Sequence, residues 1–383
     1  MLRRQSISHR SAALVASGLA LVALTACGGD DGGSSSDDFS VTDALADVPG
    51  SALEDDYILT VADLDRASEL AGTKRPAANS DDTDDILDWL IDIEGYQRDD
   101  GDDWPVVSVP LPEAINPRGA RDTPEFRDEL GWSVLDVSSF AEVSAPPVRF
   151  TVLQGDFDTE QIDAAIDSND DDVWSIGEED FAVDISDVSA ARPLGESLRL
   201  AEQDGALAVS KSTPPIEDWL EGDDRLDGDD DLVAVARELD EHDVYAAMIL
   251  DGDDLTTDPL SIAGPDATPE QLEEIEERLG GMLLAPFEVF GAGLTVVDDE
   301  AVGVLAYQHS TADAAEENAE LLETLFADGS SVRTSEPLSE MFTDVEVTVD
   351  GTAVTVTLGF ADDTPTNVLW NAIQVRELFA SHA

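Results

Sequence analysis

The sequence is poor in cysteine, lysine and histidine, three residue types on which much protein chemistry depends. Its 383 residues include one cysteine, Cys27, four histidines, and only two lysines, Lys74 and Lys211. Because a disulfide needs two cysteines, the chain cannot form one within itself. Catalysis by a serine or cysteine nucleophile needs a nearby base, usually histidine, and the sequence has no Gly-x-Ser-x-Gly elbow. The composition therefore argues against a Ser-His or Cys-His enzyme.

Motifs for metals and nucleotides are missing as well. The sequence has no His-Glu-x-x-His, no Cys-x-x-Cys and no phosphate-binding Gly-x-x-x-x-Gly-Lys. Gly291-Ala292-Gly293 lacks the third glycine of a dinucleotide-binding turn. Paired carboxylates can hydrolyse glycosides, but with 87 acidic residues such pairs are inevitable and none stands out. We therefore expect no catalytic residue, no cofactor and no bound metal.

Positive charge is scarce in general. The chain has 19 basic and 87 acidic side chains, a net charge of −68, and aspartate outnumbers glutamate by 56 to 31. Affinity for nucleic acid depends on clustered lysine and arginine that release counterions, so we expect no nucleic-acid partner. The same charge disfavours a polybasic contact with anionic lipid headgroups. We interpret the acidity as general solvation of the surface rather than as a dedicated site for divalent cations.

The start of the chain has the features of an export signal. Arg3, Arg4 and Arg10 form a basic start, and Ser11 to Ala23 form an apolar stretch. This stretch is shorter than the roughly 20 residues that a membrane-spanning helix needs. It ends in Leu24-Thr25-Ala26-Cys27, a branched apolar residue followed by two small residues and a cysteine. These four residues resemble the lipobox of bacterial lipoproteins.

The resemblance implies that the bond between Ala26 and Cys27 is cut and that the Cys27 thiol carries a diacylglycerol. Residues 1–26 are then a lipoprotein signal peptide, and the remaining 357 residues carry a net charge of −71. Two or three acyl chains give lasting attachment, so the partner of Cys27 is the lipid bilayer. We expect an extracytoplasmic protein, anchored by lipid at the outer face of the cytoplasmic membrane. The chain resembles uncharacterised cell-envelope lipoproteins of the actinobacterial type in its low lysine content, its abundant alanine and aspartate, and its Cys-Gly-Gly-Asp-Asp start. This likeness transfers no functional residue.

The rest of the chain divides into a tether and two folded regions. Residues 27–40 are rich in glycine, serine and aspartate, a composition that predicts a flexible acidic tether. We expect a first domain over 41–240 and a second over 241–383. Three segments predict hairpins: Leu198–Ser210 around Asp204-Gly205, Leu294–Tyr307, and Val345–Gly359 around Asp350-Gly351. Since strands joined by tight turns are antiparallel, the predicted fold is α+β, with two similar lobes, antiparallel sheets built from hairpins, and helices packed on one face.

The two regions also share a local pattern. A hairpin over 198–210 is followed by a predicted helix after Thr213, and the hairpin over 294–307 is followed by one after Thr311. A diverged duplication explains this pattern. Chance similarity between two ordinary α+β domains explains it equally well.

Two tryptophans are the candidate ligand-binding residues. Trp104 lies in a long Pro-, Gly- and Asp-rich loop, and Trp132 follows a predicted helix end. Exposed aromatic side chains at such places bind ligands, although a tryptophan there also serves as a plug over the core. The predicted function is that of a non-enzymatic binding or accessory module of the cell envelope, whose protein or small-molecule ligand the sequence does not identify. The alternative is the solute-binding lipoprotein of an ATP-driven (ABC) importer, which would need two lobes around a cleft.

Overall fold

The computed structural model describes residues 39–53, 57–97, 104–115, 123–166, 169–170, 172–222, 224–257, 268–271, 279 and 282–382. These residues belong to one unit, Asp38–Ala383. The expected signal peptide, the lipobox with Ala26 and Cys27, and nearly all of the 27–40 tether lie outside the described residues.

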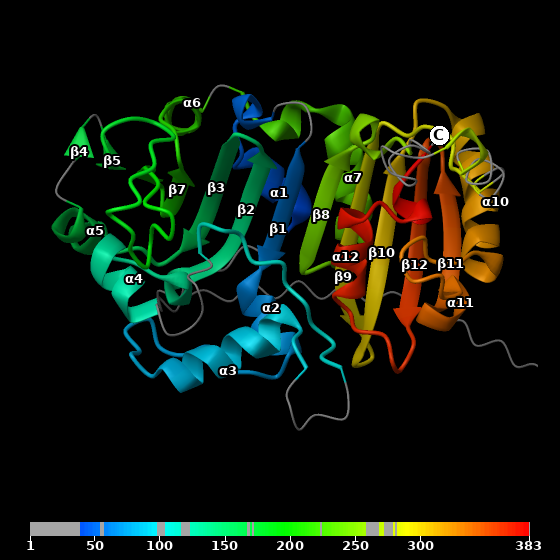
Figure 1. Cartoon of the computed structure of the whole chain (residues 1–383), viewed down its shortest axis with the longest axis horizontal. Helices are drawn as coiled ribbons and strands as arrows, with labels where there is room; N and C mark the ends of the chain where they lie inside the picture. The colour runs from blue at the N-terminus through cyan, green and yellow to red at the C-terminus, as the bar shows by residue number, and fades with distance from the viewer. Residues whose placement is uncertain are drawn as a thin grey trace, which may run out of the picture. The chain divides into compact units, whose positions relative to one another are not determined.

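Within the described residues, twelve strands form one sheet in which every neighbouring pair is antiparallel (Figure 1). Their order across the sheet is β11-β12-β10-β9-β8-β1-β2-β3-β7-β6-β5-β4. The antiparallel pairing that the hairpins predict is confirmed. The strands are β1 (Ile58–Asp63), β2 (Val137–Ala145), β3 (Val148–Gly155), β4 (Asn169–Asp170), β5 (Val173–Ile176), β6 (Leu198–Gln203), β7 (Ala206–Ser210), β8 (Ala246–Asp251), β9 (Val289–Val297), β10 (Glu300–Gln308), β11 (Phe342–Asp350) and β12 (Ala353–Phe360).

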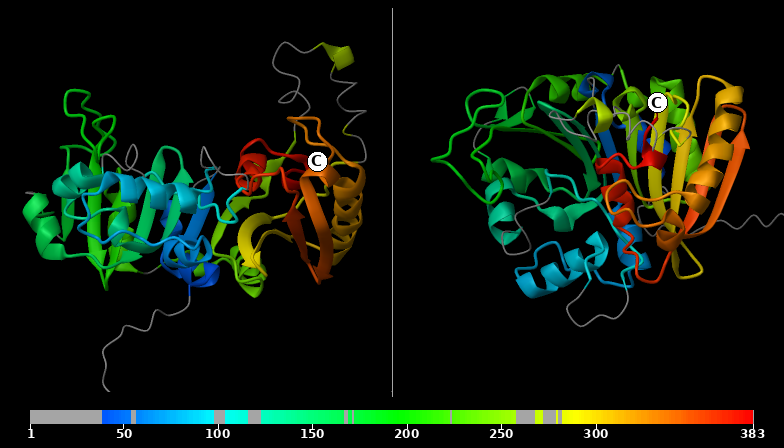
Figure 2. Two further views of the ribbon diagram at one scale, coloured as in Figure 1. Left: turned by 90° about the horizontal axis from the view of Figure 1, so that it is seen from below. Right: turned by 45° about the vertical axis from the view of Figure 1, so that its right-hand side comes forward.

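Helices cover both faces of this sheet, which Figure 2 shows from two further directions. One face packs against α1 (Val41–Ala46), α6 (Pro214–Glu221) and α7 (Asp230–Glu241). The other packs against α2 (Leu64–Leu70), α3 (Thr83–Glu94), α4 (Thr123–Leu130), α5 (Thr159–Ala165), α10 (Ala312–Asp328), α11 (Leu338–Met341) and α12 (Val368–Gln374).

The prediction that helices pack on one face only is therefore wrong. The physical reason lies in strands such as β8, whose Ala-Ala-Met-Ile-Leu sequence is apolar at every position. Because successive side chains point to opposite faces, Ala247 and Ile249 enter one core cluster while Met248 and Leu250 enter the other. A strand that is apolar on both faces has to be covered on both.

The two halves of the sheet have the same strand topology. In the first half, β1, β2 and β3 form a meander, α5 follows, and the β6–β7 hairpin returns to place β7 beside β3. In the second half, β8, β9 and β10 form the meander, α10 follows, and the β11–β12 hairpin returns to place β12 beside β10. This correspondence supports a duplication. The sequence pattern compares the 198–210 hairpin with the 294–307 hairpin, whereas the topology matches the β6–β7 hairpin with the β11–β12 hairpin.

The halves are joined edge to edge rather than separated. β1 pairs with β8 along its length, from Ile58 opposite Leu250 to Ala62 opposite Ala246. Two separate lobes are therefore not confirmed, because strands from both predicted domains belong to one sheet. The expected boundary between residues 240 and 241 falls in the last turn of α7.

Candidate functional site

A pocket lies in the first half of the molecule, on the face of the sheet that α4 covers. Its cavity volume is about 60 Å³. Its apolar walls come from α4 and the residues after it and from the strands β6 and β7: Phe126, Leu130, Trp132, Leu198 and Val209. This volume is well below the roughly 300–1,000 Å³ usual for sites of drug-sized ligands, so the pocket suits only a molecule of a few heavy atoms.

A long connection between β5 and β6, residues 177–197, covers the pocket, and we call it the roof loop. Ala190, Ala191 and Pro193 of the roof loop line the pocket. The backbone of this loop is fixed by its own hydrogen bonds, from Asp184 N to Gly195 O at 2.8 Å and from Ser197 N to Ala182 O at 2.9 Å.

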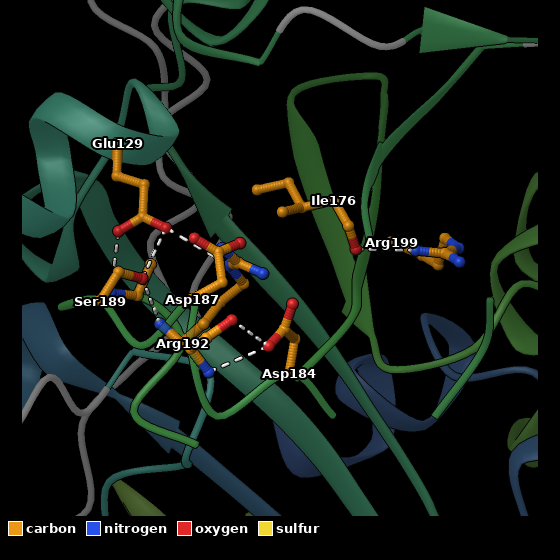
Figure 3. A network of polar contacts seen from close by, with 9 residues as sticks. Glu129, Ile176, Asp184, Asp187, Ser189, Arg192 and Arg199 are labelled. Carbon is orange, nitrogen blue, oxygen red and sulfur yellow. Dashed lines mark hydrogen bonds and ion pairs between the residues drawn. The ribbon is translucent and has the colours of Figure 1, made fainter. Parts of the chain in front are cut away.

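Glu129 of α4 fastens the roof loop to the wall of the pocket (Figure 3). One carboxylate oxygen accepts a hydrogen bond from Ser189 Oγ at 2.7 Å, and the other accepts one from the Ala191 amide at 3.3 Å. Arg192 is only 6% exposed and lies with its Nε 3.5 Å from the same carboxylate, while its other end pairs with Asp187. Two lining elements, α4 and the roof loop, are thus held together by an ionic cluster around the buried Arg192.

A second buried arginine anchors the two ends of the roof loop. Arg199 of β6 donates from Nη1 to the carbonyl of Ile176, before the loop, and to that of Leu198, directly after it. Its Nε lies 3.0 Å from Asp180 Oδ1, within the loop. Since both arginines are almost fully buried and bonded to backbone or carboxylate, the roof loop is a preorganised structure.

The polar end of the pocket contains two cations on neighbouring strands. β3 pairs with β7 up to Phe150 opposite Ser210, so the register places Arg149 beside Lys211. We call these two residues the cation pair. Like charges opposite each other on a sheet are destabilising unless an anion lies between them.

Glu113 supplies that anion. Its carboxylate contacts Arg149 Nη1 through one oxygen and lies 2.9 Å from Lys211 Nζ through the other. Lys211 also lies 2.6 Å from Glu196. In a chain with 19 basic residues, two of them meet at one end of this pocket.

A third carboxyl group, that of Glu142 on β2, adjoins the cation pair. The Glu142 side chain is buried, accepts a hydrogen bond from Thr151 Oγ1 at 2.9 Å, and lies 3.9 Å from Arg149 Nε. Burial raises the pKa of Glu142 to about 7, although the Thr151 hydrogen bond and the charge of Lys211 oppose this. Glu142 therefore changes charge near neutral pH.

Two buried hydrogen-bond donors of the pocket lack acceptors. Among the described residues, neither Trp132 Nε1 nor Arg149 Nε has a hydrogen-bond partner, and both residues line the pocket. Buried donors are nearly always satisfied, so these two need an explanation. The Glu142 carboxylate, 3.9 Å from Arg149 Nε, neutralises the arginine without a hydrogen bond, whereas Trp132 Nε1 has no polar partner among the described residues.

The structure separates the two tryptophans that the sequence singles out. Trp132 is 1% exposed, packs edge-on against Phe126 and Phe157, and lines the pocket. Trp104 is half-buried and is not among the described residues that line it. The next residue, Pro105, accepts a hydrogen bond from Thr366 in the second half of the chain. Ligand binding by either tryptophan stays a prediction.

Sequence reasoning missed the charged residues of this site: Glu113, Glu129, Glu142, Arg149, Arg192 and Lys211. The rarity of lysine was the available signal, because Lys211 is one of only two. The three glutamates of the site could not be singled out, because the sequence has 87 acidic residues.

Comparisons with known proteins add little. No family model matches the sequence, and no curated protein matches it. The structure of crystal form I of TP0453 is similar with a TM-score of 0.38 and 9% identity, over 87% of this chain and 97% of that one. Crystal form III of TP0453 gives a TM-score of 0.31 and 10% identity, over 82% and 94%. Likeness at this level supports no inference about fold or function.

Two further properties concern membranes and metals. In the part of the chain that the structure describes, no helix has both the length and the apolar character needed to cross a bilayer. In the same part, no three histidine, cysteine or acidic side chains gather as metal ligands would.

Proposed function

We propose that this chain is a lipid-anchored, extracytoplasmic lipoprotein of the bacterial cell envelope that acts without catalysis, as a binding module. Its ligand occupies the pocket beneath the roof loop. The observation that carries the proposal is a small preorganised pocket that has apolar walls and the cation pair at one end. Natural ligand sites combine apolar walls with a few placed polar groups in this way.

The anchoring part of the proposal is supported by Leu24-Thr25-Ala26-Cys27 and the apolar stretch before it. Its test is mass spectrometry of the native protein extracted from membranes. The expected N-terminal peptide begins at Cys27 and has the mass of a diacylglyceryl or triacyl cysteine. An unmodified thiol or an intact leader would contradict the anchoring.

The binding part is tested with propionate, a probe of five heavy atoms that matches the size of the cavity, by saturation-transfer NMR. We expect saturable binding to the wild type, and loss of that binding in Ala190→Trp, whose indole would fill the pocket. The matched control is Ile185→Trp, on the same loop but 84% exposed and not a lining residue. Equal propionate binding by both variants would refute the pocket as the binding site.

The importer alternative has no comparable support. Such proteins bind their solute between two lobes, whereas both halves here contribute to one antiparallel sheet. All lining residues of the pocket lie between positions 113 and 211, within the first half.

A further inference from the structure

The roof loop displays a cluster of exposed apolar side chains, which we call the apolar patch. Among the described residues, ten large apolar side chains are exposed, and five of these lie within residues 181–194 of this loop. They are Phe181, Val183, Ile185, Val188 and Leu194, with exposed fractions from 44% to 84%. Single exposed apolar residues are common on protein surfaces, whereas a cluster of them marks a place of interaction.

Backbone pairing within the loop brings members of the patch together. Val183 pairs antiparallel with Glu196. The same register places Ile185 opposite Leu194, and it places Val183 on the same side as Ile185, two positions away. The left view of Figure 2 shows the loop projecting from the sheet, on the face that α4 covers. The patch is therefore presented to the surroundings rather than to the core.

The two buried arginines hold the loop in this form. Arg192 ties it to Glu129 of α4, and Arg199 bonds to the backbone at both of its ends. Turning the apolar side chains inward would break these contacts and leave buried charges without partners. Because a surface that is already ordered loses little conformational entropy on binding, a loop held in this way is suited to recognition.

Acidic residues alternate with the patch along the loop. Five of them are exposed: Glu178, Glu179, Asp180, Asp184 and Asp187. The single basic residue of the loop, Arg192, is buried. The exposed surface of the loop thus combines apolar side chains with negative charge only.

This charge decides between three candidate occupants of the patch. A second copy of the chain, with its net charge of −68, would bring the same acidic residues against it. An anionic bilayer surface repels carboxylates, and segments that insert into it carry lysine and arginine on their polar side. A protein surface with an apolar centre and a basic border is complementary to the loop in both respects.

We propose that the roof loop is a docking surface for a protein partner whose contact area has an apolar centre bordered by lysine and arginine. The apolar patch forms the centre of the interface, and the exposed carboxylates of the loop form its polar rim. This inference goes beyond the pocket, which lies beneath the loop and takes no part in it.

The chemistry of the surface is tested with three forms of β-cyclodextrin, which share an apolar cavity wide enough for one side chain. Their rims differ in carrying amines, neutral hydroxyls or carboxymethyl groups. In a titration followed by methyl NMR, the amino form should bind the roof loop at about tenfold lower concentration than the neutral form. The carboxymethyl form should bind more weakly than the neutral form. Equal binding of all three forms would overturn the proposed partner chemistry.

Variants with fewer apolar side chains show whether the patch is the contact. Ile185→Ser combined with Leu194→Ser should weaken binding of the amino form by about tenfold or more. The matched control combines Val297→Ser with Val349→Ser, which removes two exposed apolar side chains from β9 and β11 and should leave binding unchanged. All four positions are exposed, so the urea unfolding midpoints should stay at the wild-type value. Equal weakening by the two pairs would overturn the assignment to the roof loop.

The partner itself is sought by photocrosslinking in intact cells that express the full chain, with p-benzoylphenylalanine at position 185 or, as a control, at position 297. We expect an adduct with a different protein from position 185 only. That protein, once purified, should bind the wild type more weakly as salt rises, and should bind the Ile185→Ser and Leu194→Ser double variant about tenfold more weakly. An adduct with lipid, an adduct between two copies of the chain, or no adduct would each overturn the proposal.

The Ala190→Trp variant separates this proposal from the proposed function. It should lose propionate, which reports on the pocket, and keep the amino form of β-cyclodextrin, which reports on the patch. If propionate does not bind the wild type at all, the pocket fails as a site while the docking surface stands. If Ala190→Trp loses both probes, the patch is not a surface separate from the pocket, and the proposal is overturned.

Discussion

Glu142 offers a quantitative test of the electrostatics at the site. Glu142 is 7% exposed, and burial raises the pKa of its carboxyl group from 4.5 to about 7. Each unit of pKa difference between folded and unfolded states corresponds to about 1.4 kcal/mol. The shift therefore corresponds to about 3 kcal/mol of free energy of unfolding.

The sign follows from proton uptake. Between pH 4.5 and about 7 the folded protein holds a proton on Glu142 that the unfolded chain has lost. Stability therefore falls as pH rises through this window, and below it Glu142 costs nothing. The Glu142→Gln variant cannot titrate, so it should exceed the wild type by less than about 1 kcal/mol at pH 5 and by about 3 kcal/mol at pH 8.5.

The assay is urea unfolding followed by tryptophan fluorescence at half-unit steps from pH 5 to 8.5. Because a net charge of −68 makes general repulsion grow with pH, only the difference between variant and wild type is informative. Glu300→Gln, at an exposed strand position, is the matched control and should run parallel to the wild type. Parallel profiles for Glu142→Gln as well would refute the argument from burial.

Three further predictions concern the roof loop and the sheet. Arg192→Met should lower the free energy of local opening of the roof loop by about 3 kcal/mol. The backbone amides of the loop should then exchange with deuterium roughly a hundredfold faster, as followed by mass spectrometry. Unchanged exchange would contradict the role of Arg192 in holding the loop. Gly195→Ala should destabilise by about 3 kcal/mol in urea unfolding, because Gly195 has a φ of +71° and a Cβ there would lie 1.9 Å from Asp184 O. The control is Gly205→Ala, because Gly205 has a φ of +87° but open space around a Cβ, and it should cost about 1 kcal/mol. Equal destabilisation by both variants would argue against a steric contact between residue 195 and Asp184 O. Pulse-labelling exchange in urea should give one unfolding midpoint for peptides of β2–β3 and β9–β10, since one sheet joins them, and two midpoints would indicate separate domains.

Local chemistry made part of the fold predictable. The turn of the β6–β7 hairpin follows from Asp204-Gly205, which have φ of +54° and +87°. The position of Asp63, between an apolar β-branched run and Leu64–Leu70, predicts a helix cap, and its side chain accepts a hydrogen bond from Arg66 N at 2.9 Å. Trp89 and Trp219 lie in segments with helical periodicity, which predicts that they belong to the core, and both are buried. In each case the determining residues lie within a few positions of one another.

Long-range pairing was beyond the same reasoning. No sequence pattern predicts a strand over 137–145, although β2 lies between β1 and β3 and is buried along much of its length. Nor does any local pattern indicate that Ile58 pairs with Leu250. The cation pair depends on the register of β3 against β7, which brings together residues 62 positions apart. Register of this kind is set by which face of each strand enters which core, a property of the assembled sheet.

The comparison of the two halves shows why the pocket lies in the first. The end pair of the β10–β12 ladder, Val302 opposite Gly359, has the place in the topology that Phe150 opposite Ser210 has in the β3–β7 ladder. One step further along the register, the second half has Ala301 and Phe360, where the first has Arg149 and Lys211. The roof loop likewise lies in the connection between α5 and β6, while the corresponding connection of the second half, from α10 to β11, is short and contains α11. The shared sheet is thus a scaffold, and the candidate site arises from substitutions at one strand end and from connecting segments of one half.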